Sequence, residues 1–328
     1  MTRSEKLRLH APGMARRASA WLMLMLATLT GAACNRGDGA KPTVALVVKT
    51  LNNAFFVEME KGARAAADSL GIELVVQAPE REVDVEKQMA IVENLIQTRV
   101  GVLALVPNGA RELVPAIVKA NRANIPVIIV DSRVDTTALR AAGGTIASFI
   151  GSDNVDGGRL AGRFVAEKLA GKGQVAVLEG IPGHESGDSR LRGFREALSS
   201  HPALTIVSSQ TANGERDQGF NVAQNILQAH PGVQAIFACN DVMALGAVEA
   251  IAAAGKTGKI VVVGFDAQDD ARKAIDAGRM AATIAQSPAA MGRLAVVSAY
   301  KLLRKEAVPS EQPVAIELVS GNATAARR

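Results

Sequence analysis

The chain is 328 residues long, which exceeds one typical domain and suits two. Hydrophobic residues make up 48% of it but aromatic residues only 3%, so aliphatic side chains must build the core. The net charge of +5 is concentrated in the first 33 residues, where five basic residues and one acidic residue give +4. The remainder is nearly neutral, which excludes a general nucleic-acid-binding surface.

The first 33 residues are typical of an export signal. Arg16 and Arg17 precede an apolar run over 20–30 that is too short to span a bilayer comfortably. Small residues follow and lead to Cys34. We therefore expect a signal peptide over 1–33.

A cysteine directly after such a segment is typical of a bacterial lipoprotein, so Cys34 is the predicted lipidation site. Gly31 departs from that pattern, because such sites favour leucine three residues before the cysteine. Ordinary cleavage to a soluble periplasmic protein is the alternative. Residues 34–41 are polar and rich in glycine, which predicts a tether.

From Pro42 onward, short apolar runs rich in β-branched residues alternate with segments of helical periodicity. The first set predicts strands over 43–48, 72–77, 101–106, 126–131 and 145–151, with helices over 55–70, 83–98 and 110–123. The second set predicts helices near 154–170, 189–200, 217–229 and 242–254, before strands over 174–180, 204–209, 234–239 and 259–265. A strand over 281–285, a helix near 288–304 and a strand over 314–319 end the pattern. Two successive sets of this kind predict an α/β protein with two Rossmann-like lobes, each built on a parallel doubly wound sheet.

Polar and aromatic side chains follow the predicted strands. These residues are Asn52, Asn53, Phe55, Phe56, Asp131, Asn240, Asp241, Asp266 and Gln286. Ligands of open parallel sheets bind beyond the carboxyl ends of the strands, so we expect these side chains to gather at one site. Carboxylates and amides can pair with neighbouring hydroxyls, and aromatic rings can cover the C–H faces of a sugar.

Each of these residues also has a simpler interpretation. Asn240 and Asp266 are candidate helix caps, and the two phenylalanines are candidate core residues. Gln286 lies at a helix start, and Arg190 lies where a solvated side chain is the usual outcome.

Six motifs together resemble the ribose-binding-protein family of bacterial solute receptors, a periplasmic binding protein type I fold. They are TLNNAFF (50–56), GSDNVDGGRLAG (151–162), RLRGF (190–194), FACNDVMALGA (237–247), VVVGFDA (261–267) and AATIAQ (281–286). The resemblance implies three crossovers between the lobes, near Ser152–Asp153, Gln286–Ser287 and Gln312–Val314. The first lobe would comprise 42–152 and 287–313, the second 153–286 and 314–322, and 323–328 would form a tail.

The resemblance also implies a function. Family members close on a sugar like a trap and dock on an ATP-driven importer in the inner membrane, with a chemotaxis receptor as a possible second partner. The matching positions imply ligand contacts at Asn53, Phe55, Phe56, Asp131, Arg190, Asn240, Asp266 and Gln286. No cofactor and no metal is implied.

Three positions depart from the ribose pattern. Val106 replaces an asparagine, Ser132 replaces an arginine and Gly214 replaces a phenylalanine, while 210–218 resembles relatives that bind inositol or other polyols. Nearby Asn108, Arg133 or Asn213 could compensate. We therefore expect a hexose, cyclitol or other polyol to bind at least about tenfold more tightly than ribose, since each 1.4 kcal/mol is tenfold.

Three other functions compete with sugar binding. A sugar-responsive repressor would carry a helix-turn-helix where this chain has its export signal. An enzyme is not indicated, because the sequence has no HExxH, GxSxG, P-loop or Cys/His cluster. A receptor of the same fold for a non-sugar signal, such as a furanosyl autoinducer, remains the principal alternative.

Overall fold

The computed structural model describes residues 43–321. The predicted signal peptide, the tether with the lipidation site Cys34, and the C-terminal tail lie outside these residues. No helix among the described residues has the length and apolar character needed to cross a membrane.

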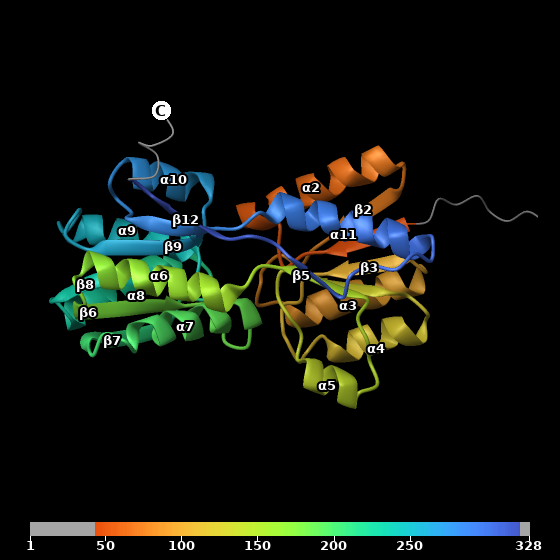
Figure 1. Ribbon diagram of the computed structural model, residues 1–328, viewed down its shortest axis with the longest axis horizontal. Coiled ribbons are helices and arrows are strands. Elements are labelled where there is room, and N and C mark those ends of the chain that lie inside the picture. The colour runs from red at the N-terminus through yellow and green to blue at the C-terminus, as the bar shows by residue number, and fades with distance from the viewer. Residues whose placement is uncertain (1–42, 322–328) are drawn as a thin grey trace, which may run out of the picture. The chain divides into compact units, whose positions relative to one another are not determined.

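The first lobe is built on a six-stranded sheet in which every neighbouring pair of strands is parallel (Figure 1). Its strands, in spatial order, are β11 (Glu311–Pro313), β5 (Ser148–Gly151), β4 (Val127–Val130), β3 (Val102–Leu105), β1 (Thr43–Val47) and β2 (Glu73–Gln77). Its helices are α2 (Ala54–Leu70), α3 (Val85–Gln97), α4 (Val114–Arg122), α5 (Thr136–Ala141) and α11 (Pro288–Leu303). Helices α2 and α11 pack together over one buried cluster of the sheet, and α3 and α4 cover the other.

The second lobe repeats this strand order in a sheet of its own (Figure 1). Its strands are β12 (Glu317–Ser320), β10 (Ala282–Ala285), β9 (Val261–Asp266), β8 (Val233–Ala238), β6 (Lys172–Glu179) and β7 (Ala203–Thr211). Its helices are α6 (Asn154–Lys168), α7 (Glu185–Leu198), α8 (Arg216–Ala229), α9 (Asp241–Ala253) and α10 (Asp269–Asp276). The two-lobed α/β fold is therefore confirmed.

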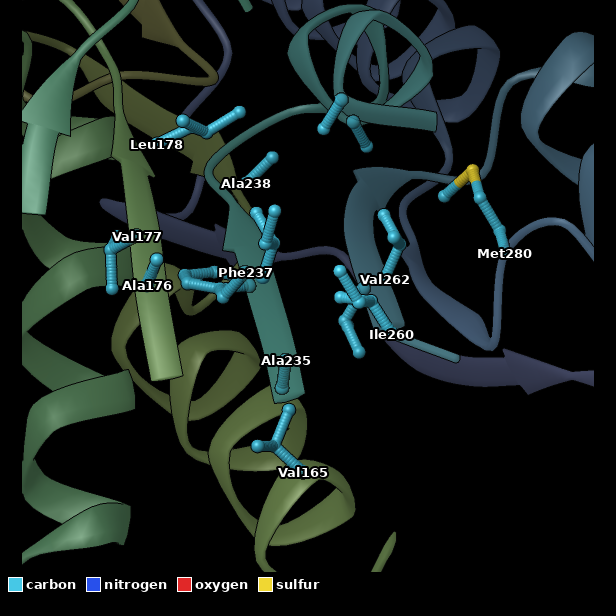
Figure 2. Packing of buried hydrophobic residues seen from close by; sticks show 14 of the residues in the cluster. Val165, Ala176, Val177, Leu178, Ala235, Phe237, Ala238, Ile260, Val262 and Met280 are labelled. Atoms are coloured by element: carbon cyan, nitrogen blue, oxygen red, sulfur yellow. The ribbon is translucent and has the colours of Figure 1, made fainter. Parts of the chain in front are cut away.

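Aliphatic side chains fill the second lobe, as the composition predicts. Figure 2 shows part of its core, where Phe237 on β8 lies between Ala176 on β6 and Val262 on β9. Phe237 also stacks on Phe194 of α7, with ring centroids 4.4 Å apart. This contact fixes α7 against the sheet, and α7 carries part of the site described below.

The structure differs from the predicted elements in several places. Helices α5 and α10 and strand β11 were not predicted, because six, eight and three residues are too few to establish a period. Strand β12 runs antiparallel to β10, whereas a parallel sheet was expected. Helix α7 begins at Glu185 rather than near 189, so Arg190 lies in the interior of the helix rather than at its start.

Candidate functional site

A cavity with about 290 Å³ of empty space lies between the two lobes, at the carboxyl ends of their parallel strands. Ten residues line it: Lys49, Asn53, Phe55, Phe56, Glu82, Asp131, Ser186, Arg190, Asn240 and Asp266. Seven of the eight sequence-predicted contacts are in this set, so the structure brings them together as the strand-end argument requires.

Two aspartates occupy equivalent places in the two lobes. Asp131 follows β4 and Asp266 ends β9, and both are buried. Both also have a positive φ, 64° for Asp131 and 107° for Asp266. Such a backbone costs roughly 1–3 kcal/mol in a residue other than glycine and is concentrated at functional sites. The shared strain indicates that both carboxylates are held where they are for a purpose other than stability.

The hydrogen bonding of these two carboxylates differs. Asp131 Oδ2 accepts a 3.1 Å hydrogen bond from Ser132 Oγ, whereas its buried Oδ1 has no partner. Asp266 Oδ1 accepts a 2.9 Å hydrogen bond from Gln286 Nε2 and lies 3.4 Å from Arg190 Nη1. Burial raises the pKa of Asp266 to about 7, against the opposing effects of Arg190 and Gln286. An unsatisfied buried oxygen is costly, so Asp131 Oδ1 is a vacant acceptor for a ligand donor.

Arg190 is buried and held by its own lobe rather than solvated. Its Nε donates to Asn154 Oδ1 at 2.9 Å, and its Nη1 donates to the Cys239 carbonyl at 2.7 Å. Its guanidinium also lies 3.9 Å above the centroid of the Phe265 ring. Gly158 on α6 permits this arrangement, because a Cβ there would clash with the Arg190 backbone. The guanidinium plane is thus fixed before any ligand arrives.

The two phenylalanines serve both as core and as cavity wall. Phe55 and Phe56 are buried in the first lobe and meet edge to face, with centroids 5.2 Å apart. Both also line the cavity, so the two interpretations offered by the sequence hold together.

Asn53 caps α2 and also connects the lobes. Its Oδ1 accepts from the Phe55 backbone at 3.0 Å and from Gln268 Nε2 of the second lobe at 2.9 Å. Its Nδ2 donates to Glu82 Oε1 at 3.2 Å. The side chain is therefore part of the closed interface as well as of the cavity wall.

Asn240 and Gln286 complete the predicted set. Asn240 caps α9 by accepting from the Met243 backbone at 2.8 Å, and its Nδ2 donates to the Gly214 carbonyl at 3.2 Å. Gln286 lines a neighbouring pocket rather than the cavity itself, although it reaches the site through Asp266. Its buried Oε1 has no partner. Asp266 itself caps no helix, since Gln268 is the residue before α10.

Sequence reasoning missed Lys49, Glu82 and Ser186. Lys49 directly follows the apolar run predicted as a strand over 43–48, which is a usable signal for a strand-end residue. Glu82 and Ser186 lie five and six residues beyond the predicted strand ends at 77 and 180, so the strand-end rule does not reach them.

The three candidates for compensation do not enter the cavity. Asn108 is fully buried and bonds Gln88 and the Lys49 carbonyl. Arg133 forms a bidentate pair with Glu311, and Asn213 bonds Gln218. Val106 is a core residue of the first lobe. Among the described residues, no group of three or more His, Cys, Asp or Glu side chains is arranged to hold a metal ion.

Comparisons with known proteins agree with this geometry. A family model described as the periplasmic binding protein domain matches residues 44–307. The ribose import binding protein of Haemophilus influenzae is 42% identical over 297 residues, covering 90% of this chain and 98% of the relative. The D-allose-binding periplasmic protein of Escherichia coli is 37% identical over 273 residues, covering 83% and 88%.

Solved structures give the same picture. A periplasmic solute binding protein of an ABC transporter from Actinobacillus succinogenes, with bound D-allose, superposes with a TM-score of 0.83 at 40% identity, covering 87% of this chain and all of that one. A solute binding protein from Bacillus halodurans with bound myo-inositol gives a TM-score of 0.81 at 27% identity, covering 89% and 98%. All four are described as binding proteins, three of them of import or ABC transport systems, in agreement with the prediction that the chain is not an enzyme.

Proposed function

Because this chain belongs to the ribose-binding-protein family of periplasmic binding proteins, we propose that it captures an uncharged monosaccharide or polyol between its lobes and delivers it to the membrane permease of an ABC importer. The observation that carries the proposal is the interlobe cavity, whose wall includes the unpartnered acceptor Asp131 Oδ1. A ligand hydroxyl would donate to that oxygen and satisfy it. The relatives named above bind ribose, D-allose and myo-inositol according to their descriptions, so the proposed class covers all three.

The second lobe supplies the complementary chemistry. Arg190 offers a fixed donor and Asp266 a nearby acceptor, so one ligand diol can both accept and donate hydrogen bonds. Phe55 and Phe56 offer apolar wall for the C–H face of a ring. Groups from both lobes on one ligand favour the closed arrangement, because the ligand binds that state more tightly.

Titration calorimetry against pentoses, hexoses, inositols and tetritols tests the binding proposal. We expect at least one member to bind with a dissociation constant in the micromolar range or below, about −8 kcal/mol. Small-angle scattering with that ligand should show a smaller radius of gyration than without it. If no member of the panel binds but a furanosyl signal does, the non-sugar receptor is the correct function.

Cellular location provides a second test. The family acts in the periplasm, and we further propose that Cys34 anchors this member through a lipid, on the basis of its place after the apolar run. Replacing Cys34 with serine should move the protein from the membrane fraction to the soluble periplasmic fraction. Identical fractionation of the variant and the parent would exclude the anchor.

A further inference from the structure

The interlobe cavity continues beyond the ten residues that line it. A second cavity with about 320 Å³ of empty space shares Lys49, Glu82, Ser186, Arg190 and Asn240 with the first. It extends to His184 and Gly214, which the first cavity does not reach. We refer to Lys49, Glu82, His184 and Gly214 as the arm subsite.

Gly214 keeps this end of the cleft open. Its φ of +76° suits glycine, and its carbonyl accepts the hydrogen bond from Asn240 Nδ2. A Cβ at this position would already lie 3.4 Å from that nitrogen. The loop therefore presents only backbone to the arm subsite, and a larger side chain would fill part of it.

Lys49 places a poorly satisfied cation in the arm subsite. The residue is only 2% exposed, yet its ammonium donates one long hydrogen bond, 3.4 Å to Ser186 Oγ, and makes no ion pair with any described residue. An ammonium has three donors, and Lys49 uses only one of them, at a long distance. Lys49 therefore has donor capacity that a ligand acceptor can use.

His184 and Glu82 supply acceptors beside this cation. His184 is 6% exposed, and its buried Nε2 has no hydrogen-bond partner. Burial, together with the charge of Lys49, lowers the pKa of His184 to about 2, while its ring hydrogen-bonds the Asn108 backbone. The imidazole is thus neutral, and Nε2 is free to accept. Glu82 bonds Asn53 through Oε1 and leaves Oε2 available.

We propose that the arm subsite binds the exocyclic hydroxymethyl group of a hexopyranose, with the hydroxyl accepting from Lys49 Nζ and donating to Glu82 or His184. The inference rests on the proposed function and narrows its ligand class. A hydroxyl fits because it both accepts and donates. An ammonium arm would pair with Glu82 but meet the like charge of Lys49, and a carboxylate arm would pair with Lys49 but meet the like charge of Glu82. A hydroxyl can hydrogen-bond both groups without that repulsion and without the cost of burying a charge.

Matched pairs of sugars isolate this one group. D-allose and D-ribose, D-glucose and D-xylose, and D-galactose and L-arabinose differ, as pyranoses, only by the hydroxymethyl group. Calorimetry on the parent protein should show that the hexose of the best-binding pair binds at least tenfold more tightly than its pentose. In Lys49→Met, the affinity for that hexose should fall at least tenfold and the affinity for the pentose less than threefold, so that the advantage disappears.

Lys119→Met is the matched control, since Lys119 lies on α4 in an exposed pair with Glu93 and should leave both affinities unchanged. His184→Phe serves as a second variant that fills the same space, and should also remove the hexose advantage if Lys49→Met fails to fold. The inference is overturned if a variant loses affinity equally for both sugars, or if the hexose advantage survives both variants. It is also overturned if the tightest ligand has no hydroxymethyl arm. If no sugar binds at all, the proposed function fails and this inference fails with it.

Discussion

The two lobes share a strand order but prepare their halves of the site differently. In the second lobe, the polar groups already bind one another: Arg190 is held by Asn154 and Cys239 and lies beside Asp266, which Gln286 also bonds. In the first lobe, Asp131 Oδ1 has no partner and Lys49 has one long hydrogen bond that crosses to the second lobe. The second lobe thus holds Arg190 and Asp266 as a preorganised platform, although His184 Nε2 and Gln286 Oε1 have no partner. The first lobe offers the ligand Asp131 and Lys49, which have few partners of their own. This contrast predicts that changes in the second lobe affect stability and affinity together, whereas changes in the first affect mainly affinity.

The largest expected effect is on the platform. Arg190→Met removes the cation beside buried Asp266 and leaves Asn154 Oδ1 and the Cys239 carbonyl without their donor. We expect the free energy of unfolding to fall by roughly 3 kcal/mol, as for other buried pairs that lose one partner, and affinity to fall with it. Denaturant titration and calorimetry measure the two. Arg195→Met changes an exposed residue on the same helix and should alter neither the free energy of unfolding nor the affinity by much. An Arg190→Met protein as stable as the parent would contradict the difference between the lobes.

The two aspartates offer the closest matched test. Each should accept charged hydrogen bonds worth roughly 1.5–3 kcal/mol, so Asp131→Ala and Asp266→Ala should each weaken sugar binding by about one to two decades. Without ligand, Asp131→Ala should lower the free energy of unfolding only a little, because Oδ1 bonds nothing and the one hydrogen bond lost is that from Ser132 Oγ. Asp266→Ala should lower it, because Arg190 and Gln286 lose a shared partner. Wild-type affinity in both variants would mean that neither carboxylate contacts the ligand.

Proton binding by Asp266 gives a third, smaller effect. Burial raises its pKa to about 7 in the folded protein, so the folded state binds this proton more tightly than the unfolded state. The stabilisation is therefore fully present below the unfolded pKa of about 4 and is lost as the pH rises through 7. Between pH 6 and pH 8 the free energy of unfolding of the ligand-free protein should fall by about 1.4 kcal/mol. Asp266→Asn should not show this fall in the free energy of unfolding. An identical pH profile in the variant would mean that Asp266 does not cause it.

The smallest expected effect is at the direct contact between lobes. Gln268→Ala removes the 2.9 Å hydrogen bond to Asn53 without touching the cavity, which Gln268 does not line. One hydrogen bond contributes about 0.5–1.5 kcal/mol, so affinity should fall by roughly threefold to tenfold through a less populated closed state. Thermal stability should be unchanged, and scattering without ligand should show a larger radius of gyration. A variant with wild-type affinity would show that this contact does not favour closure.

The sequence predicted the site best where one local rule applied. Asp131, Asn240 and Asp266 each follow a buried parallel strand, and a pattern of apolar runs is enough to find such positions. Arg190 was identified only through the family resemblance, since its burial depends on α6 approaching α7 at Gly158. Glu82, Ser186 and His184 were missed because each lies in a loop or a first helical turn several residues beyond a strand end. The same limit applies to β12, whose antiparallel direction follows from the last crossover rather than from its residues.

The route of the chain between the lobes has a consequence for folding. The first lobe needs α11 to cover one face of its sheet and β11 to complete the edge beside β5, yet both follow all of the second lobe except β12 in sequence. Contacts between α2 and α11 span more than two hundred residues, and closing so long a loop is slow. A nascent chain can assemble most of the second lobe from contiguous residues, but it cannot bury the core under α2 until α11 has been synthesised. The order of synthesis therefore keeps the N-terminal half of the protein incompletely folded until almost the entire chain exists.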